Sequence, residues 1–277
     1  MLWNIAVSIA IAYGAIVALL FLFQSRLVYF PEIGRDIAAT PQVYGLDFES
    51  VNIVTEDGET LHAWWVPATD TRGTVLFFHG NAGNISHRID YLLMFRRLGY
   101  ATLIFDYRGY GKSTGSPSEE GTYRDAAAAW RWLTQTRGIQ PGGIVFAGES
   151  LGGAVASWLA VRHAPRALVL LSTFTSAPDL GAQVYPFIPV RLISRFSYDN
   201  LANLRQIKAP VLVAHSRDDD IVPFAHGRKI FEAAGEPKQF LEMRGGHNDG
   251  FIFMREEWVK TLAAFLERAG APQNQKH

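Results

Sequence analysis

Residues 148–152, with the sequence GESLG, constrain the fold of this chain more than any other stretch. They follow a short apolar run at 144–147 and precede a longer, alanine-rich apolar run at 154–160. This pattern predicts a buried strand, a tight turn and a helix. In that context G-x-S-x-G is typical of a nucleophile elbow, because glycines two residues before and after the serine permit a turn too sharp for side chains. The alternative is a glycine- and serine-rich turn that arose by chance.

The sharp turn would position two groups, the Ser150 hydroxyl and the Leu151 backbone N–H. Backbone strain is expected to hold the hydroxyl of Ser150 above the edge of the sheet. The N–H of Leu151 lies at the start of the predicted helix and points to where an oxyanion would form. Ser150 is therefore a candidate nucleophile, and Leu151 is a candidate oxyanion donor.

Composition bounds the number of domains and excludes several kinds of site. The chain has 277 residues, 48% of them hydrophobic, which is enough for one large core. Its 26 basic and 26 acidic residues give a formal net charge of zero, so no basic field favours nucleic acid. The lack of cysteine excludes disulfides, thiolate metal sites and a cysteine nucleophile. Residues 271–277 are expected to form a loose tail.

Residues 2–23 carry no charge. As a helix they would span about 33 Å, close to the hydrocarbon thickness of a bilayer. Trp3 at one end, and Arg26 and Tyr29 beyond the other, suit the membrane interface. We expect an uncleaved membrane anchor over residues 1–26, with a cleaved signal peptide or a buried core helix as alternatives.

A signal peptide fits this run less well, because no Lys or Arg precedes it and no clear small-x-small cleavage site follows it. Arg26 and Arg35 lie on the C-terminal side of the span. On those two charges, the positive-inside rule favours a domain on the cytoplasmic side of the membrane.

The rest of the chain has the pattern of an α/β fold. Residues 27–46 are rich in turn residues and are expected to form a linker. Residues 48–54 and 60–66 alternate in polarity around an Asp-Gly turn, which predicts a β-hairpin. From residue 74, apolar strands alternate with segments of helical length. The expected strands are 74–78, 101–105, 144–147, 167–171, 211–214 and 239–243, and the expected helices are 89–98, 119–137, 151–161, 223–234 and 252–268.

Strands that are apolar on both faces and separated by helices imply a mostly parallel sheet with helices on both sides. The hairpin would add an antiparallel edge at the N-terminal side of that sheet. In open parallel sheets the functional site lies at the carboxyl ends of the strands, so the loops there carry the candidate residues.

The loop after strand 74–78 has the sequence HGNAGN at 79–84. Small residues let backbone N–H groups approach a ligand closely, and the N–H of Asn81 is the expected second oxyanion donor. His79 is expected to be a structural hydrogen-bonding residue rather than a base, because it precedes the nucleophile in the chain. Alternatively, Asn81 and Asn84 only shape the turn.

The loop after strand 101–105 contains Asp106 and Arg108 among several glycines. These two charges are expected to form a local ion-paired brace, with substrate contact as the alternative. The loop lacks the Gly-x-x-x-x-Gly-Lys-Ser/Thr spacing and is therefore not a phosphate loop.

Three adjacent acids, Asp218, Asp219 and Asp220, follow strand 211–214. No other acidic cluster offers the further oxygen ligands that a hard cation needs, so we expect no metal site here. A catalytic triad needs one carboxylate in this loop; Asp219 is our choice and Asp218 the alternative. Asp220 is expected to cap the helix that Pro223 opens.

His247 lies in a glycine-flanked loop after strand 239–243, where it is free to swing over Ser150. A surface histidine would be the default interpretation elsewhere. Here the order Ser150, Asp219, His247 along successive strand ends favours a nucleophile–acid–base triad. Asp249 is expected to cap the final helix.

Several motifs together carry a resemblance to a known family. They are FFHGNAGNISHR (77–88), FDYRGYGKSTGSPSEEG (105–121), GESLGGAVA (148–156), DDDIVP (218–223) and GGHND (245–249). With these motifs the chain resembles, from about residue 48 to residue 268, serine hydrolases of the α/β-hydrolase fold. Its apolar N-terminal run followed by LVYFP (27–31) is similar to the membrane-anchored subgroup typified by alpha/beta hydrolase domain-containing protein thirteen. Ser216 departs from the glycine that relatives often have there.

The resemblance implies a three-layer α/β-hydrolase fold around a mostly parallel sheet of eight strands. It implies Ser150, Asp219 and His247 as the catalytic triad. It also implies the backbone N–H groups of Asn81 and Leu151 as the oxyanion hole. No cofactor and no metal ion are expected.

Within the expected catalytic domain, 47–270, a short lid segment at 172–204 is rich in aromatic and proline residues. We expect one or two small helices there, which line an apolar acyl pocket with Phe174, Tyr185 and Phe187. Ordinary packing of these aromatic residues over the sheet is the alternative.

These features predict a carboxylesterase-type serine hydrolase that forms an acyl-enzyme on Ser150. Short- to medium-chain esters are the expected substrates, and bulky, polymeric or lipid esters stay open. An acyl-protein thioesterase, a peptidase and a non-catalytic binding protein on the same scaffold are the competing functions. The expected partners are a small-molecule or lipid ester and the membrane, through residues 2–23; no nucleic acid and no required protein partner are expected.

Overall fold

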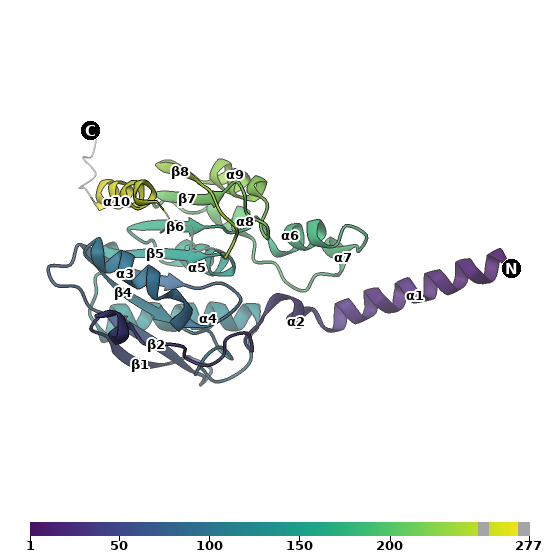
Figure 1. Ribbon diagram of the computed structural model, residues 1–277, viewed down its shortest axis with the longest axis horizontal. Helices are drawn as coiled ribbons and strands as arrows, with labels where there is room; N and C mark the ends of the chain where they lie inside the picture. The colour runs from purple at the N-terminus through teal and green to yellow at the C-terminus, as the bar shows by residue number, and fades with distance from the viewer. Residues whose placement is uncertain (249–254, 271–277) are drawn as a thin grey trace.

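The computed structural model describes residues 1–248 and 255–270, and its centre is a single eight-stranded sheet (Figure 1). The strands are β1 (Glu49–Val54), β2 (Thr60–Val66), β3 (Gly73–Phe78), β4 (Tyr100–Phe105), β5 (Ile144–Glu149), β6 (Ala167–Leu171), β7 (Val211–Ser216) and β8 (Lys238–Met243). Their order across the sheet is β1-β2-β4-β3-β5-β6-β7-β8. The predicted fold class is therefore confirmed.

The sheet is antiparallel at one edge and parallel elsewhere. β1 pairs with β2, and β2 with β4, in antiparallel register, whereas the other neighbours are parallel. The hairpin turn closes where the Thr55 N–H donates to the Glu59 carbonyl at 2.9 Å. Gly58 in this turn has a φ of 90°, which side chains disfavour. The carboxyl ends of the parallel strands meet along one edge of the sheet.

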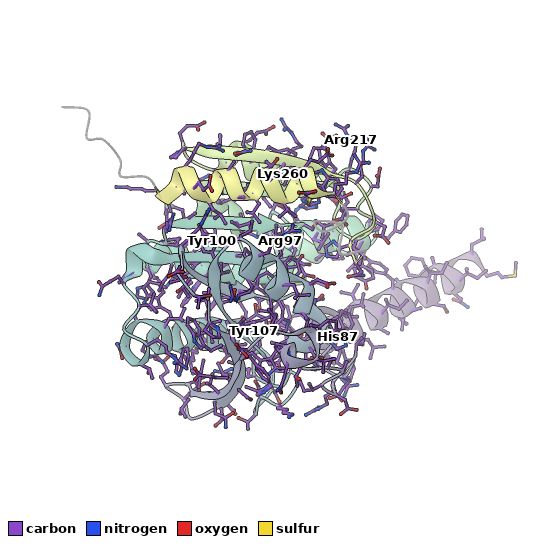
Figure 2. All side chains as sticks on the ribbon, turned by 60° about the vertical axis from the view of Figure 1, so that its left-hand side comes forward. His87, Arg97, Tyr100, Tyr107, Arg217 and Lys260 are labelled. Carbon is purple, nitrogen blue, oxygen red and sulfur yellow. The ribbon has the colours of Figure 1, made fainter. Side chains whose placement is uncertain are left out.

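Helices cover both faces of this sheet. They are η2 (Ile85–Arg88), α3 (Ile89–Arg97), α4 (Glu119–Arg131), η3 (Trp132–Thr136), η4 (Pro141–Gly143), α5 (Leu151–Arg162), α9 (Phe224–Ala233) and α10 (Glu256–Gly270). α3 and α10 pack on one face, and α4, α5 and α9 on the other (Figure 1). Lys260 lies on the solvent side of α10 (Figure 2). Successive strand residues alternate between the two cores, so that Phe77 faces α3 and Phe78 faces the opposite layer.

Two predicted helices differ from the observed ones at their ends. The helix predicted over 119–137 changes after Arg131 from α4 into the wider turn η3. The final helix, predicted from residue 252, is described from Glu256 onward as α10, and the start predicted for it lies outside the described residues.

The N-terminal part consists of a long helix and a packed connection. α1 (Leu2–Leu22) buries no residue and extends away from the domain (Figures 1 and 2). It is the one helix among the described residues that is long and apolar enough to span a membrane. α2 (Gln24–Val28) follows it, and η1 (Pro41–Tyr44) precedes β1.

The stretch expected to be a linker, 27–46, is packed against the domain. Tyr29 is buried, and its hydroxyl lies 2.7 Å from the Tyr198 hydroxyl. The Phe30 N–H donates to the Asn81 carbonyl at 3.0 Å, next to the strand ends. These contacts fix the root of α1 beside the edge of the sheet where the parallel strands end.

The lid segment contains three short helices, α6 (Ala177–Val184), α7 (Val190–Ile193) and α8 (Asn200–Leu204). α6 and α7 pack on each other, on the side of the domain from which α1 projects (Figure 1). α8 packs instead on α5 and α9 and buries Leu204. Two small helices, α6 and α7, therefore form the outer part of the lid.

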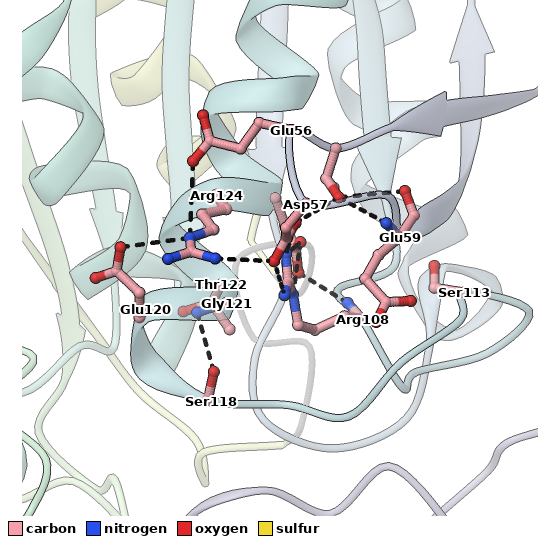
Figure 3. Close-up of polar contacts among 12 residues, drawn as sticks. Glu56, Asp57, Glu59, Arg108, Ser113, Ser118, Glu120, Gly121, Thr122 and Arg124 are labelled. Atoms are coloured by element: carbon pink, nitrogen blue, oxygen red, sulfur yellow. Dashed lines mark hydrogen bonds and ion pairs between the residues drawn. The ribbon is translucent and has the colours of Figure 1, made fainter.

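Arg108 and Asp106 do not pair with each other, which corrects the local brace expected from the sequence. The Arg108 guanidinium binds Asp57 in the hairpin turn at 2.8 and 3.0 Å (Figure 3). It also binds Asp125 in α4 at 2.8 and 2.9 Å. Burial raises the pKa of Asp125 to about 6, whereas the Arg108 hydrogen bonds hold the pKa of Asp57 below its usual value. The arginine thus joins the antiparallel edge to a covering helix.

Replacing this arginine should destabilise the fold. Arg108→Ala is expected to lower the free energy of unfolding by about 3–5 kcal/mol, because it leaves the buried carboxylate of Asp125 without its cation. Arg124→Ala is the matched control: Arg124 is partly exposed and contacts Asp57 at 3.1 Å, so its loss should change little. Urea unfolding of the detergent-solubilised protein, followed by tryptophan fluorescence, measures both. Equal losses for the two variants would contradict the proposed brace.

Candidate active site

Ser150 occupies a strained turn between β5 and α5. Its backbone has φ 52° and ψ −117°, a left-handed conformation that costs a non-glycine residue about 1–3 kcal/mol. The Ser150 N–H donates to the Leu171 carbonyl at 2.9 Å, which ties the turn to β6. A side chain at Gly152 would collide with the Phe78 carbonyl, and one at Gly148 with the backbone of α5. The glycines of GESLG are therefore required by close backbone approach.

Asp219 and His247 are brought together by the loops after β7 and β8. The imidazole Nδ1 of His247 lies 2.8 and 3.0 Å from the two carboxylate oxygens of Asp219. Asp219 is buried and also accepts the N–H groups of Ile221 and Val222 at 3.0 and 2.7 Å. Burial alone would raise the pKa of Asp219, but the hydrogen bond from His247 and those two N–H groups hold the pKa below its usual value. Asp219 is thus a buried anion.

The two neighbouring acids have other partners. Asp218, the alternative acid, lies on the surface and pairs with Arg244 at 3.1 Å. The Asp220 carboxylate accepts the backbone N–H of His247 at 2.8 Å. The cap role expected for Asp220 is wrong, because α9 begins at Phe224 and no side chain caps it. The cap role expected for Asp249 lies outside the described residues.

Ser150 and His247 lie on the same edge of the sheet but are not hydrogen-bonded. His247 lines a cavity of about 440 Å³ together with Glu149 and Leu171. Glu149 directly precedes Ser150, and Leu171 holds the Ser150 N–H, so the imidazole lies close to the turn. Among the described residues no hydrogen bond joins the Ser150 hydroxyl to His247. Catalytic hydrogen bonds are often longer in ligand-free structures than in substrate complexes.

A second cavity, of about 360 Å³, contains Ser150 itself. Its wall includes Asn81 and Leu151, whose backbone N–H groups meet no acceptor among the described residues. The rest of the wall is mostly apolar and comes from α1, α2 and the lid. The residues are Leu20, Gln24, Leu27, Val28, Phe30, Phe174, Ala177, Leu180, Gly181, Val184, Tyr185, Ile188, Val190, Ile193, Ser194, Phe196, Tyr198, Ile221 and Val222. Two free N–H groups beside a hydroxyl can bind a developing oxyanion.

The aromatic residues predicted for the pocket divide between its wall and the protein surface. Phe174 and Tyr185 line the Ser150 cavity. Phe187 does not: its side chain is 87% exposed, on the outer side of the turn between α6 and α7. The prediction for Phe187 is therefore corrected, since this short lid turn has no periodic pattern that fixes which side chains point inward.

The polar residues of the first two loops have structural roles. The His79 Nδ1 lies 2.7 Å from the Gly80 carbonyl, and burial lowers the pKa of His79 to about 3. Its Nε2 faces Asp106 at 3.6 Å, and Asp106 accepts the Ile85 N–H at 2.9 Å. The Asn84 amide caps η2 and donates to backbone carbonyls of the 27–46 segment. His79 is thus a structural residue, as expected.

Sequence reasoning missed a partly buried ion pair beside Ser150. The Arg88 guanidinium binds Glu149 at 3.1 and 3.2 Å and the Ala82 carbonyl at 3.0 Å. It therefore clamps the loop that carries Asn81 to the residue before Ser150. Both residues lie inside motifs of the sequence, but their spacing of 61 residues gives no local signal of a pair.

Sequence reasoning also missed His215, which lies under the acid. His215 is fully buried in β7, with its Nε2 2.8 Å from the Val222 carbonyl and 3.5 Å from Asp219. A carbonyl can only accept, so Nε2 carries the proton. Burial lowers the pKa of His215, and the histidine stays neutral. It closes the loop that holds Asp219. The described residues contain no cluster of metal-ligating side chains, and none forms around Asp218–Asp220.

The buried histidine should make stability depend on pH. Below the ordinary histidine pKa of 6.5 the unfolded chain protonates at this position while folded His215 does not, so stability falls as pH decreases. The slope from one such group approaches about 1.4 kcal/mol per pH unit. His215→Gln should therefore show a shallower loss of stability between pH 7.5 and 5.5 than the wild type, measured by urea unfolding. Parallel slopes would contradict a neutral buried histidine.

The sequence of this chain is similar to those of several known proteins. A family model described as alpha/beta hydrolase fold matches residues 73–192. Alpha/beta hydrolase domain-containing protein WAV2 of Arabidopsis thaliana is 34% identical, and the match covers 94% of this chain and 92% of WAV2. Protein bem46 of Schizosaccharomyces pombe is 36% identical over 89% of this chain and 87% of bem46. An uncharacterized protein of Mycobacterium tuberculosis is 39% identical over 93% of this chain and 92% of its own length.

Solved structures share the architecture at lower identity. The Pyrococcus furiosus esterase Pf2001 superposes with a TM-score of 0.70 at 22% identity, covering 87% of this chain and 98% of the esterase. Est1E from Butyrivibrio proteoclasticus, solved with ferulic acid bound, superposes with a TM-score of 0.67 at 18% identity, covering 79% and 99%. At these identities the likeness concerns the fold.

Proposed function

This chain belongs to the alpha/beta hydrolase fold family, as its motifs predicted, and on that premise we propose that it is a serine hydrolase that cleaves carboxylic esters. The observation that carries the proposal is the strained turn at Ser150 on the same sheet edge as the His247–Asp219 pair. The Pyrococcus furiosus esterase among the structural neighbours is in keeping with it. Ester cleavage by this set of groups needs no cofactor.

In the proposed reaction, Ser150 attacks the ester carbonyl while the His247 Nε2 takes the hydroxyl proton. Asp219, bound to Nδ1 of His247, fixes the ring orientation and stabilises the imidazolium. The N–H groups of Asn81 and Leu151 bind the tetrahedral oxyanion. His247 then protonates the departing alcohol, and water activated by His247 releases the acid from Ser150.

The two cavities suggest where the halves of the substrate lie. The apolar cavity of about 360 Å³, with Phe174 and Tyr185, suits an acyl chain. The cavity of about 440 Å³ beside His247 has Arg88, Asp90 and Glu149 among its lining residues and suits the alcohol. Short- to medium-chain esters fit this division, and a thioester of an acylated protein is the second candidate, because the same apolar wall would hold its acyl group. A peptidase and a non-catalytic binding protein have no specific support.

We also propose that α1 anchors the protein in a membrane rather than serving as a cleaved signal sequence. Its helix is long enough to span a bilayer. The Tyr13 hydroxyl donates to the Phe187 carbonyl at 2.8 Å, and Leu20 lines the Ser150 cavity, so α1 is integrated with the domain. Arg26 and Arg35 favour the cytoplasmic side for the domain.

Removing the nucleophile tests the proposal directly. Ser150→Ala should reduce turnover of p-nitrophenyl butyrate by at least about 10³-fold and abolish labelling by a fluorophosphonate probe. Ser157→Ala is the control, because Ser157 is a buried serine of α5 whose hydroxyl donates to Ala154 outside both cavities. Folded wild-type protein that neither labels nor turns over esters would favour the binding-protein alternative. Wild-type turnover by Ser150→Ala would refute Ser150 as nucleophile.

The choice of acid gives a second prediction. Asp219→Asn should lower kcat by about 10³–10⁴-fold, because the amide no longer holds the imidazole in the required tautomer. Asp218→Asn changes the adjacent, exposed carboxylate and should leave kcat within about twofold, as surface ion pairs contribute little. Steady-state kinetics on a p-nitrophenyl ester series distinguishes them. A larger effect at Asp218 would reassign the acid.

A further inference from the structure

The outer lid, defined here as residues 177–193, presents apolar side chains to the outside of the molecule. Val184 is 54% exposed, and Phe187 and Leu192 are each 87% exposed. The charged residues in this segment, Asp179 and Arg191, pair with each other at 3.0 Å. Between them, residues 180–190 contain no charged side chain. Exposed apolar surface of this kind marks an interaction site in a soluble or membrane protein.

The outer lid runs alongside the C-terminal half of α1. The Phe187 carbonyl accepts the Tyr13 hydroxyl at 2.8 Å, and the Gln24 side chain bonds Ile193 and Arg195 at 2.7 and 2.8 Å. Figure 1 shows α6 and α7 on the side of the domain from which α1 projects. Tyr13 lies nine residues before the end of α1, about 14 Å along the helix. If α1 crosses a bilayer, the lid tip reaches the hydrocarbon.

Several polar groups of the lid turn and of the root of α1 have partners that suit a lipid environment. Two N–H groups of the lid turn bond within it: the Ile188 N–H donates to the Tyr185 carbonyl and the Val190 N–H to the Ile188 carbonyl. The Phe187 carbonyl is bound by Tyr13, so it needs no water. Two further arginines, Arg26 and Arg195, lie at the root of α1 over phenylalanine rings. Arginine and aromatic side chains at that level suit the headgroup region.

The Ser150 cavity is lined by the same elements. Leu20 of α1, Leu27 of α2, and Ile188 and Val190 of the lid all line it. Ser150 lines the same cavity as these apolar side chains. An acyl chain could therefore pass from the side of α1 to the hydroxyl without leaving apolar surroundings.

We propose that the outer lid enters the membrane leaflet beside α1, and that the Ser150 cavity takes long acyl chains directly from that leaflet. The occupant of the exposed lid surface is lipid, because that surface continues the bare apolar surface of α1. The substrate class is then an ester whose acyl chain resides in the bilayer. This second half rests on the proposed esterase function, whereas insertion of the lid does not.

Insertion can be measured without reference to activity. The chain has no cysteine, so Leu192→Cys gives one labelling site for an environment-sensitive fluorophore. In full-length protein reconstituted into phosphatidylcholine–phosphatidylglycerol vesicles, the label should shift to the blue, be quenched by lipid-attached nitroxides and resist aqueous iodide. Val43→Cys, at an exposed apolar residue of η1 on another part of the surface, is the matched control and should stay open to iodide.

Two results of this measurement would overturn insertion. Equal access of iodide to both labels would place the lid in water. Resistance to iodide together with resistance to lipid-attached nitroxides would place a protein surface, such as a second copy of this chain, over the lid.

Paired substrates test delivery from the leaflet. The double variant Phe187→Ser/Leu192→Ser should hydrolyse soluble p-nitrophenyl acetate within about twofold of wild type, since neither residue lines the cavity. It should hydrolyse a long-chain umbelliferyl ester embedded in the vesicles at least tenfold more slowly. Equal rates of variant and wild type on the embedded ester would overturn delivery through the lid. Wild-type protein inactive on both substrates would instead refute the esterase function, and the label would still decide whether the lid inserts.

Discussion

The turn at Ser150 depends on three backbone segments that lie closer together than side chains allow. α5 passes so near the end of β3 that Gly152 meets the Phe78 carbonyl, and Gly148 meets the first turn of the same helix. This approach holds Ser150 at a φ of 52°, although the conformation is unfavourable by about 1–3 kcal/mol. The same turn leaves the Leu151 N–H at the cavity without an acceptor among the described residues. The strain, the position of Ser150 at the cavity wall and the candidate oxyanion site thus have one physical cause.

The electrostatics of the site rest on one buried anion with complete hydrogen bonding. A buried carboxylate is tolerated only if its oxygens accept hydrogen bonds. The Asp219 carboxylate accepts them from the His247 imidazole and from two backbone N–H groups. His215 lies beneath it with its pKa lowered by burial and bonds the carbonyl of Val222, so this histidine does not compete with His247 for the acid. Asp220 holds the backbone of His247. The acidic loop thereby fixes the imidazole through both its ring and its main chain.

Much of this fold could be predicted from the sequence, because local periodicity carries it. The apolar run at 167–171 predicts a buried strand, and the Asp-Gly turn at 57–58 predicts a hairpin; the structure contains both. The pairing of Asp219 with His247 followed from their place after consecutive strands. The partner of Asp220 could not be predicted in this way. Two partners were available to its carboxylate: the start of the helix nearby and a backbone N–H 27 residues away. Propensity favours the cap, but the tertiary arrangement selects the distant donor.

Other features lay beyond the reach of sequence patterns for a different reason. The orientation of Phe187 depends on a lid turn without periodicity, and the packing of Tyr29 depends on a contact with Tyr198, 169 residues later. Nothing in an apolar run of 22 residues indicates that Leu20 will wall a cavity containing Ser150. Long-range contacts of this kind appear only when the strands have brought distant segments together. Through such contacts α1, whose sequence predicts a membrane anchor, also becomes part of the candidate active site.

The joint wall of α1, α2 and the lid has a physical consequence for the whole molecule. In water, α1 would expose most of its apolar surface, and the lid would expose Phe187 and Leu192 beside it. An apolar surface of that extent is unfavourable unless something covers it. If lipid covers this surface, the apolar side chains of α1, of the lid and of the cavity lining are all removed from water together. If the helix were removed, the cavity would lose the wall formed by Leu20 and admit water beside Ser150. Under the proposed function, membrane attachment and the shape of the acyl pocket would therefore depend on the same apolar surface.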